Sequence, residues 1–445
     1  MQAFLNRLMD AASKAGLTAC EAYVVESDSF EAGSTEGEII EYNSNTTRAL
    51  GFRGIYKGRM GYASTEAFDG EAVDQLVKGV LESAELNEDP DEVFLYDGAG
   101  EAPEINLQNP ALAQISPQEK INRLLTMEKL IKTADPRIDK TAYNGIYNVH
   151  STVRILNSHG MNRCYTEDAC GLSGNASAKE GDSITTGGFA VNARSFDKLD
   201  AEKIAAETVR RTVQGLNAKP VPSGKYRVVL FNEAMTSLLG VFSGIFSAEV
   251  AQKGLSLLAG KAGQQIAAPC VSLIDDPLLP DGMASRPFDA EGVPSSAHTV
   301  VENGVFQTFL YDLKTAHKDG VATTGNANRA SAASSVHVAP SNFYLKPGGK
   351  SFDALLEGIG EGIVITEVSG LHAGANPVSG DFSLLSKGYT FRNGKRDKAV
   401  EQITVAGNFY ELLKSVQELA NDLAFPRGGI GSPSVDVGEL SISGC

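Results

Sequence analysis

The sequence has few of the features that mark membrane-spanning, secreted or disulfide-bonded proteins. Its 445 residues contain no uninterrupted apolar run near the roughly 18 residues that a bilayer-spanning helix requires. The segment from Met1 to Ser13 is amphipathic and carries Asp10, so it lacks the form of a secretory signal. The five cysteines form no Cys-x-x-Cys pair and are odd in number. Reduced thiols in a cytoplasmic protein with no membrane segment are therefore expected.

Basic residues are also scarce. The chain has 39 Lys and Arg residues against 55 Asp and Glu residues, which gives a formal net charge of −16. Such a surface repels the phosphate backbone of nucleic acids, whose affinity for proteins depends largely on Lys and Arg. The densest basic segment, residues 392–398, has the composition of a hairpin turn. No nucleic-acid partner is therefore expected.

Spacings typical of metal sites are missing as well. The six histidines show no His-x-His or His-x-x-x-His spacing, and Cys445 is the only cysteine after Cys270. Four carboxylates offer an alternative cation site, although we favour turn caps that pair with Arg286 or Arg329; they are Asp275, Asp276, Asp289 and Glu291. We therefore expect no metal or other cofactor in this chain.

The first half of the chain predicts two similar α+β units. In each unit two helices flank an extended, glycine-punctuated segment that we interpret as an antiparallel meander. The predicted segments are 2–15, 29–65 and 69–86 in the first unit and 117–133, 139–195 and 200–216 in the second. Residues 87–110 have the Pro, Asp, Glu and Gly content of a linker. We therefore predict two helix–meander–helix units, at residues 1–110 and 111–220.

Residues 221–445 predict a β-rich domain. A buried strand at 225–231 is followed by helical spacing from Glu233 to about Leu258. The rest consists mainly of short apolar segments separated by Gly, Asn, Pro and Asp, except for a helix predicted at 409–423. The fold class is therefore α+β, and the carboxy-terminal domain is expected to be barrel-like or sandwich-like.

An acidic residue lies where the strand at 225–231 runs into the following helix. A zinc peptidase would place His-Glu-x-x-x-His there, but this chain has Asn232 and Ser237 around Glu233. An amide and a hydroxyl do not replace two imidazoles as zinc ligands. Without zinc, Glu233 has no activated water to deprotonate. The sequence predicts a degenerate site with no catalytic residue of its own.

Several short segments in order carry a resemblance to a known family. They include Gly325-Asn326-Ala327-Asn328-Arg329, and the others are residues 256–266, 275–277, 287–294, 379–383 and 405–409. In sequence and spacing, the chain from about residue 220 to 444 resembles the TldD/PmbA family, also called modulators of DNA gyrase. The amino-terminal half is compatible with that resemblance.

The resemblance implies a role in peptide hydrolysis. TldD-like members carry the His-Glu-x-x-x-His zinc site and a further Cys ligand near the carboxy terminus. PmbA-like members, also called TldE, lack these ligands and pair with a TldD subunit, and this chain is similar to the second kind. The resemblance thus implies a non-catalytic subunit of a cytoplasmic metallopeptidase complex that cleaves short or unfolded peptides. Zinc is then expected only in a TldD-type partner; the partner is that subunit or a second copy as a dimer.

Peptide substrates suggest a role for the Asn-rich segment. Asn326, Asn328 and Arg329 are predicted to line a groove that holds an extended peptide by strand addition, which uses main-chain hydrogen bonds and tolerates many sequences. Two alternatives remain open at this point. One is an autonomous peptidase or other hydrolase with an unrecognised site, and the other is a regulator that binds DNA gyrase.

Overall fold

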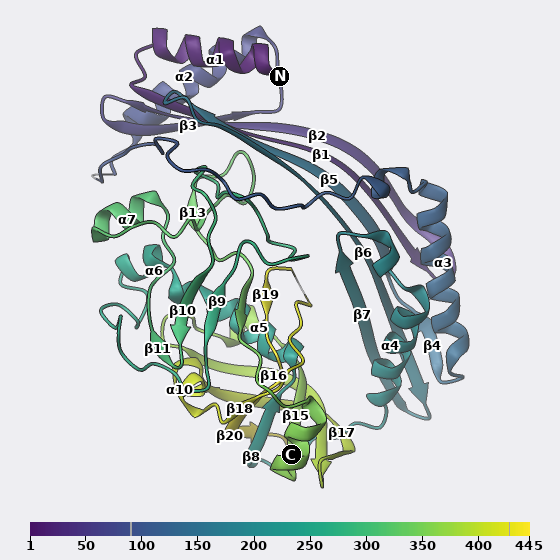
Figure 1. The fold of residues 1–445 in the computed structure, drawn as a ribbon. Helices are drawn as coiled ribbons and strands as arrows, with labels where there is room; N and C mark the ends of the chain where they lie inside the picture. The colour runs from purple at the N-terminus through teal and green to yellow at the C-terminus, as the bar shows by residue number, and fades with distance from the viewer. Residues whose placement is uncertain (90, 427) are drawn as a thin grey trace.

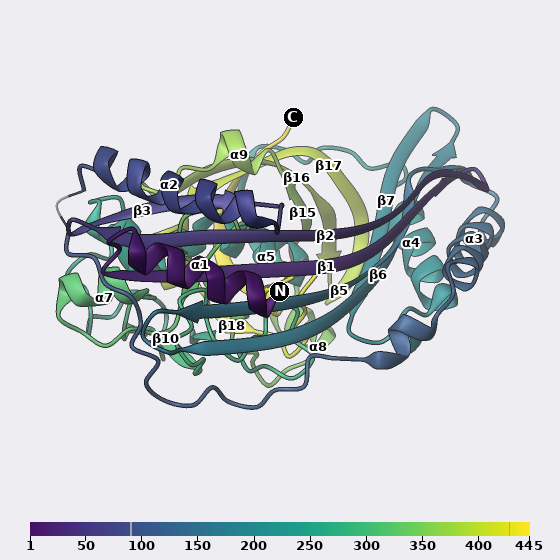
Figure 2. The same ribbon diagram turned by 90° about the horizontal axis from the view of Figure 1, so that it is seen from above.

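The structure, a computed structural model, describes residues 1–89, 91–426 and 428–445. A curved amino-terminal sheet lies over a carboxy-terminal domain, which packs against the concave face of that sheet (Figure 1). Helices cover the convex face, two near each end of the sheet (Figure 2). Within the described residues, no helix is both long enough and apolar enough to cross a membrane.

The amino-terminal half forms one sheet of seven strands. Their order is β3-β2-β1-β5-β6-β4, with β7 paired to the other side of β6. The strands are β1 (Ala19–Thr35), β2 (Glu38–Tyr56), β3 (Arg59–Thr65), β4 (Ile138–Thr141), β5 (Asn144–Asn157), β6 (Asn162–Glu180) and β7 (Ser183–Ala193). The predicted helix–meander–helix order is confirmed in both units. In addition, β1 pairs with β5 in antiparallel register from Glu21↔Asn157 to Ser34↔Asn144, which joins the two units into a single sheet.

The helices on the convex face bury their apolar stripes against this sheet. They are α1 (Gln2–Lys14), α2 (Gly70–Leu86), α3 (Pro117–Ala134) and α4 (Ala201–Gln214), with 3₁₀ turns at Pro110–Gln114 and Phe196–Lys198. The Asp69 side chain accepts the backbone N–H of Ala72, and Asp200 caps α4 in the same way. Each cap satisfies an orphan donor at the positive end of a helix dipole.

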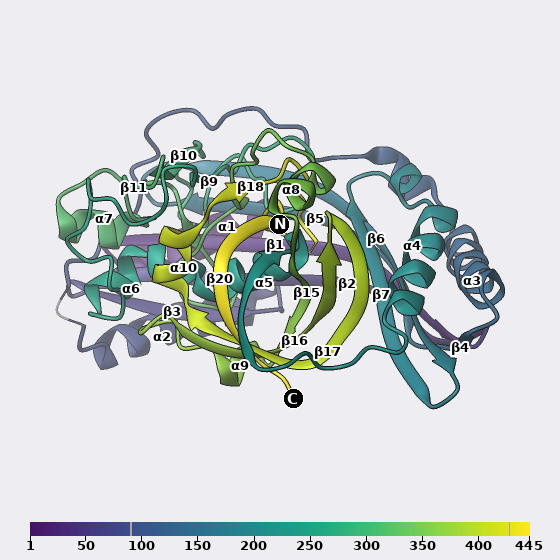
Figure 3. The same ribbon diagram turned by 90° about the horizontal axis from the view of Figure 1, so that it is seen from below.

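The carboxy-terminal domain is built on a closed barrel (Figure 3). Five strands pair in the order β17-β16-β15-β8-β20, and β20 pairs back to β17. They are β8 (Gly224–Leu230), β15 (Glu361–Ser369), β16 (Asp381–Arg392), β17 (Lys395–Asn408) and β20 (Val435–Ser443), with β18 (Glu418–Leu419) added to β20. The barrel alternative is confirmed. The segment 392–398 contains the hairpin turn between β16 and β17, but the turn itself is residues 393–394, and the rest of the segment belongs to the two paired strands.

Smaller sheets and short helices complete this domain. A five-stranded sheet contains β9 (Leu273–Asp275), β10 (His298–Glu302), β11 (Val305–Phe306), β14 (Phe343–Leu345) and β19 (Ile430–Gly431). β12 (Ala327–Asn328) pairs with β13 (His337–Val338). The helices are α5 (Asn232–Phe242), α6 (Ala248–Gln252), α7 (Leu313–Asp319), α8 (Phe352–Ile359), α9 (Leu371–Gly374) and α10 (Phe409–Ser415), with a 3₁₀ turn at Ser243–Phe246.

Two predicted helices are shorter than expected. The helix predicted from Glu233 to about Leu258 ends at Phe242, continues as the 3₁₀ turn and restarts as α6, because Ser247 adopts an extended conformation. The helix predicted to reach residue 423 ends at Ser415. Val416 leaves the helical conformation there, with a ψ of 126°, and the chain enters β18, whose pairing with β20 outweighs the local helical pattern.

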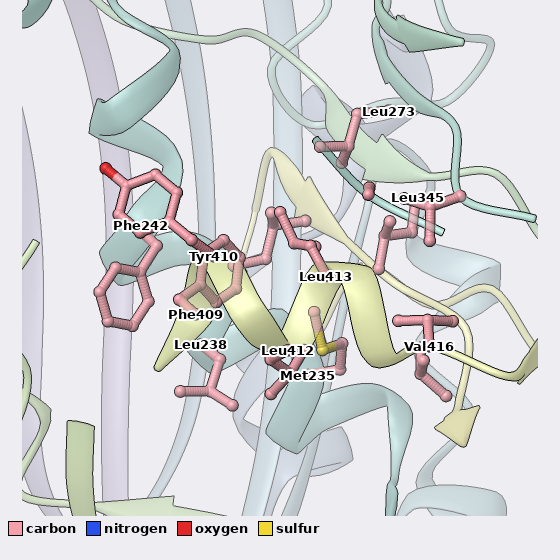
Figure 4. Close-up of a cluster of buried hydrophobic side chains, with 14 of the residues drawn as sticks. Met235, Leu238, Phe242, Leu273, Leu345, Phe409, Tyr410, Leu412, Leu413 and Val416 are labelled. Atoms are coloured by element: carbon pink, nitrogen blue, oxygen red, sulfur yellow. The ribbon is translucent and has the colours of Figure 1, made fainter. Parts of the chain in front are cut away.

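The largest apolar core fixes the position of α5. Phe242 stacks on Phe409 of α10 with ring centroids 4.5 Å apart, and neither side chain is exposed. Met235 and Leu238 of α5 point into the same cluster, where Leu413 of α10 also lies (Figure 4). Because α5 is anchored along its length, its first turn has a defined place at the end of β8.

Candidate functional site

The strand–helix corner holds its first residue in a local hydrogen-bond network. Asn232, at the start of α5, is 9% exposed. Its backbone N–H donates to Ser434 Oγ at 3.1 Å, and its side-chain Nδ2 donates to the carbonyl oxygen of Asp422 at 3.1 Å. Ser434 Oγ in turn donates to Asp422 Oδ2 at 2.7 Å. The amide of Asn232 therefore fastens the first turn of α5 to the chain between β18 and β20.

Glu233 is paired across the two halves of the molecule. Its Oε1 lies 2.6 Å from Nη1 of Arg211, which belongs to α4 of the amino-terminal half. Arg211 also contacts Glu207 at 2.6 Å and lies over the ring of Phe189. Ser237 donates its hydroxyl to the backbone carbonyl of Glu233 at 2.9 Å, which satisfies it within α5. The polar side chains of the corner thus stabilise α5 and the contact between the two halves of the molecule.

The residues around this corner do not fit a zinc ion. No group of three or more His, Cys, Asp or Glu side chains suited to a metal occurs among the described residues. Cys445 exchanges backbone hydrogen bonds with Val221 and Ser223, just before β8 begins. The whole length of β8 therefore separates that cysteine from Asn232, which follows the other end of the strand. We therefore derive no metal-dependent step at this corner.

The predicted peptide-binding residues have internal partners. Asn326 is 1% exposed, and its Nδ2 donates to Asp275 Oδ2 at 2.7 Å. Asn328 lies on β12 opposite His337 of β13. Arg329 points toward the amino-terminal sheet. The contact of these three side chains with a peptide stays a prediction. Asn328 belongs to the short sheet of β12 and β13, and Asn326 and Arg329 flank β12.

Four buried charged residues join the two halves of the molecule; we call them the interdomain ion network. Arg53 Nε lies 2.7 Å from Glu21 Oε1, and Arg53 Nη1 lies 3.2 Å from Glu291 Oε1. Arg329 Nη2 lies 2.8 Å from Glu21 Oε1. Glu21 and Arg53 come from β1 and β2, whereas Glu291 and Arg329 come from the carboxy-terminal domain. All four are at most 9% exposed, so water screens these ion pairs little.

Two of the four carboxylates considered as a cation site cap turns, as we favoured, but none of the four forms an ion pair with Arg286 or Arg329 among the described residues. Asp289 accepts the backbone N–H groups of Glu291 and Val293, and Asp276 accepts that of Leu278. These are turn caps. The expected pairing of these carboxylates with Arg286 or Arg329 is therefore wrong; the arginine that pairs with Glu291 is Arg53.

Sequence reasoning missed Arg53 and Arg211. Arg53 lies between Phe52 and Gly54 on a strand whose alternation places it on the concave face. A lone charge at an inward position of an apolar strand was the available signal for a buried ion pair. Arg211 gave no such signal, because a basic residue in the last turn of a helix is ordinary.

Comparison with known proteins covers nearly the whole chain. Models of the PmbA/TldA metallopeptidase match in order: domain 1 at residues 20–84, the central domain at 110–216 and the C-terminal domain at 223–444. A metalloprotease PmbA of Escherichia coli O157:H7 is 29% identical over 434 residues, which cover 95% of this chain and 92% of that protein.

Solved structures share the complete fold. A Thermotoga maritima protein named as a candidate modulator of a DNA gyrase has a TM-score of 0.92 and 31% identity, covering 99% of this chain and 100% of that one. TldE of Thermococcus kodakarensis has a TM-score of 0.91 at 24% identity, again over 99% of this chain and 100% of that one. The second likeness shows the fold alone.

Proposed function

Because the chain belongs to the PmbA/TldD metallopeptidase family, we propose that it is a PmbA/TldE-like, non-catalytic subunit of a peptidase complex. The complex is of the TldD/TldE type, is cytoplasmic and acts on short or unfolded peptides. The observation that supports this proposal most strongly is the set of residues at the start of α5. There Asn232 and Ser237 replace histidines, and the carboxylate that a metallopeptidase would use as general base is paired with Arg211.

The division of labour follows from this chemistry. A TldD-type subunit would hold the zinc ion, and that ion would supply the activation of water that peptide hydrolysis needs. This chain supplies structure and substrate enclosure, with Asn326, Asn328 and Arg329 as the proposed peptide contacts. Asn328 is the most accessible of the three, whereas Asn326 and Arg329 would have to leave Asp275 and Glu21 to reach a peptide. Pairing with a second copy of itself is the alternative assembly.

Replacement of Glu233 by glutamine tests the non-catalytic role. In a reconstituted complex, Glu233→Gln should leave peptide turnover within about threefold of the wild type, because Glu233 is paired with Arg211 and the residues beside it, Asn232 and Ser237, are not zinc ligands. Loss of a general base would instead lower the rate by about 10²–10⁴-fold. Turnover of an unfolded model peptide is the measurement.

Glu207→Gln is the matched control, because Glu207 is the other carboxylate that contacts Arg211. Both variants lose an ion pair to Arg211, and Glu207→Gln also loses its pair with Arg210, so the control should lower the melting temperature at least as much as Glu233→Gln does. A large loss of turnover in Glu233→Gln alone would show that Glu233 takes part in catalysis and would remove the basis of this proposal.

The name of the Thermotoga maritima relative supports a second candidate, a regulator that binds DNA gyrase. The net charge of −16 disfavours direct contact with DNA, so such a role would depend on contact with the gyrase protein. Retention of gyrase by the immobilised chain at physiological salt would favour this candidate. If the immobilised chain does not retain gyrase, the role of peptidase subunit remains the better-supported function.

A further inference from the structure

The amino-terminal sheet leaves a long stretch of strand edge uncovered. One edge of β2 pairs with β1 along nearly its whole length, but the other edge pairs with β3 only from Leu50 to Tyr56. Among the described residues, no strand pairs with that second edge before Leu50. The register of β2 against β1 shifts at Ile40, which has no partner there, so the regular part of the uncovered stretch is residues 41–49. We call residues 41–49 the open edge.

The open edge directs backbone hydrogen-bonding groups outward. In an antiparallel pair, hydrogen-bonded and non-hydrogen-bonded residue pairs alternate. The two-residue turn Lys57-Gly58 makes Tyr56↔Arg59 a hydrogen-bonded pair, so even-numbered residues of β2 face away from β1. The carbonyl oxygen of Cys20 accepts the N–H of Ser158, which agrees with odd-numbered residues at the β1–β2 contact. In the part of the chain that the structure describes, no strand meets the outward N–H groups of the open edge, which belong to Tyr42, Ser44, Thr46 and Arg48.

The side chains of the open edge give it little protection. Exposed strand edges usually carry lysine, proline or a covering element. Residues 41–49 contain neither lysine nor proline, and every side chain from Tyr42 to Arg48 is exposed, that of Tyr42 at 54%. The residues between these two are Asn, Ser and Thr, whose short side chains neither cover the backbone nor build deep pockets. An extended chain can therefore pair here through its backbone, with little dependence on its sequence.

A single extended segment fits this edge better than a second copy of the chain. The carboxy-terminal domain lies on the concave side of the sheet, and its α9, β16 and β17 reach past β2 in the view from above (Figure 2). The view from below shows the same overhang of α9 (Figure 3). The two-fold axis of an antiparallel strand pair is perpendicular to the sheet, so both copies would carry their overhanging domains on the same side. Each domain would then enter the space beneath the other sheet, whereas a single strand needs no such space.

We propose that the open edge of β2 binds an extended peptide segment by strand addition, through main-chain hydrogen bonds and with little selection among sequences. The binding itself needs only this chain, but the identification of the peptide as a peptidase substrate rests on the proposed function. The open edge is separate from Asn326, Asn328 and Arg329, because β12 belongs to a different sheet.

Binding of a labelled peptide to the isolated chain tests this site. The probe is a fluorescein-labelled, unstructured peptide of Ser, Thr and Gln with no net charge, followed by fluorescence anisotropy. Ser44→Pro removes an outward N–H and places a ring at the edge, so the dissociation constant of the peptide should rise at least about tenfold. Ser44→Ala keeps the N–H and should change that constant by less than about twofold. Proline is tolerated where a strand N–H faces solvent, so both variants should keep the far-UV circular dichroism of the wild type.

Amide hydrogen exchange of the wild-type chain tests the same site without a substitution. Saturating peptide should slow the exchange of the outward amides of the open edge at least about tenfold. The amides of β7, at the opposite border of the sheet, are the control and should not change, because β7 packs against α4 and most of its side chains are partly buried.

Four results would overturn the proposal. They are no binding of the peptide to the wild-type chain, unchanged affinity in Ser44→Pro, no slowing of exchange at the open edge, and equal slowing at β7. Slowing that grows with protein concentration in the absence of peptide would assign the edge to a second copy and would overturn it as well. Any of these would leave the peptidase role standing, because that role is tested by turnover of the complex.

Discussion

Replacing Arg53 with methionine should lower the free energy of unfolding by about 3–5 kcal/mol, the usual cost of breaking a buried ion pair by removing one partner. Arg53 is 3% exposed and neutralises Glu21 and Glu291 at the same time. Methionine fills a similar volume, so the loss reflects Glu291 left in a dry site without its arginine, and Glu21 left with Arg329 alone, rather than a cavity. Urea unfolding at pH 7.5, followed by circular dichroism, is the measurement.

Arg48→Met on the same strand is the matched control. Arg48 pairs with Glu26 at 2.5 Å, but both side chains are largely in water, at 50% and 36% exposure. Exposed pairs contribute about 0–1 kcal/mol, so this variant should lose less than about 1 kcal/mol. Equal losses for the two arginines would show that the interdomain ion network does not hold the two halves together.

Peptide hydrolysis by the isolated chain should be indistinguishable from the uncatalysed rate. Addition of a TldD-type subunit from the same genome should raise the rate of hydrolysis by at least about 100-fold. This increase is small for an enzyme, because enzymes typically exceed uncatalysed rates by about 10⁶-fold or more. A chelator should return the mixture to background, since the activated water depends on the metal. Hydrolysis of a fluorogenic unfolded peptide is the measurement.

A TldD-type subunit whose zinc-site histidines have been replaced is the control for this reconstitution. It should still pair with this chain and yet give no turnover, which separates assembly from chemistry. Turnover by the isolated chain as fast as that of the complex would instead favour an autonomous hydrolase with a site of its own.

The sequence correctly predicted those structural elements that depend only on neighbouring residues. Asp69 and Asp200 act as helix caps, and the alternating segments became strands, because caps and alternation depend on neighbouring residues. The joining of β1 to β5 was not predicted. These strands pair between residues more than a hundred positions apart, and nothing local to either strand specifies that partner.

Tertiary contacts also explain why two helices of the carboxy-terminal domain are shorter in the structure than the sequence predicts. The apolar spacing after Phe242 and after Ser415 continues in a helical manner, but those residues face strands and loops in the folded domain. Helix propensity differs by less than about 1 kcal/mol between ordinary residues, so packing and strand pairing override it. The closure of the barrel through β17 and β20 is of the same non-local kind.

At the candidate site, the sequence indicated the chemistry of the side chains but not which residues they contact. Asn232 and Ser237 could be recognised as poor zinc ligands from their chemical groups alone. The pairing of Glu233 with Arg211 depends on how α4 packs against α5, which is an outcome of the fold. For the same reason Arg329, predicted to face a peptide groove, was found facing Glu21 in the interdomain ion network.

Zinc content measured per chain tests the central claim most directly. The two subunits would be separated from a purified, active complex under native conditions, and each would be analysed for metal. We predict stoichiometric zinc on the TldD-type subunit and none above trace on this chain. Stoichiometric zinc on this chain that is lost in a Glu233→Ala variant would contradict a non-catalytic role.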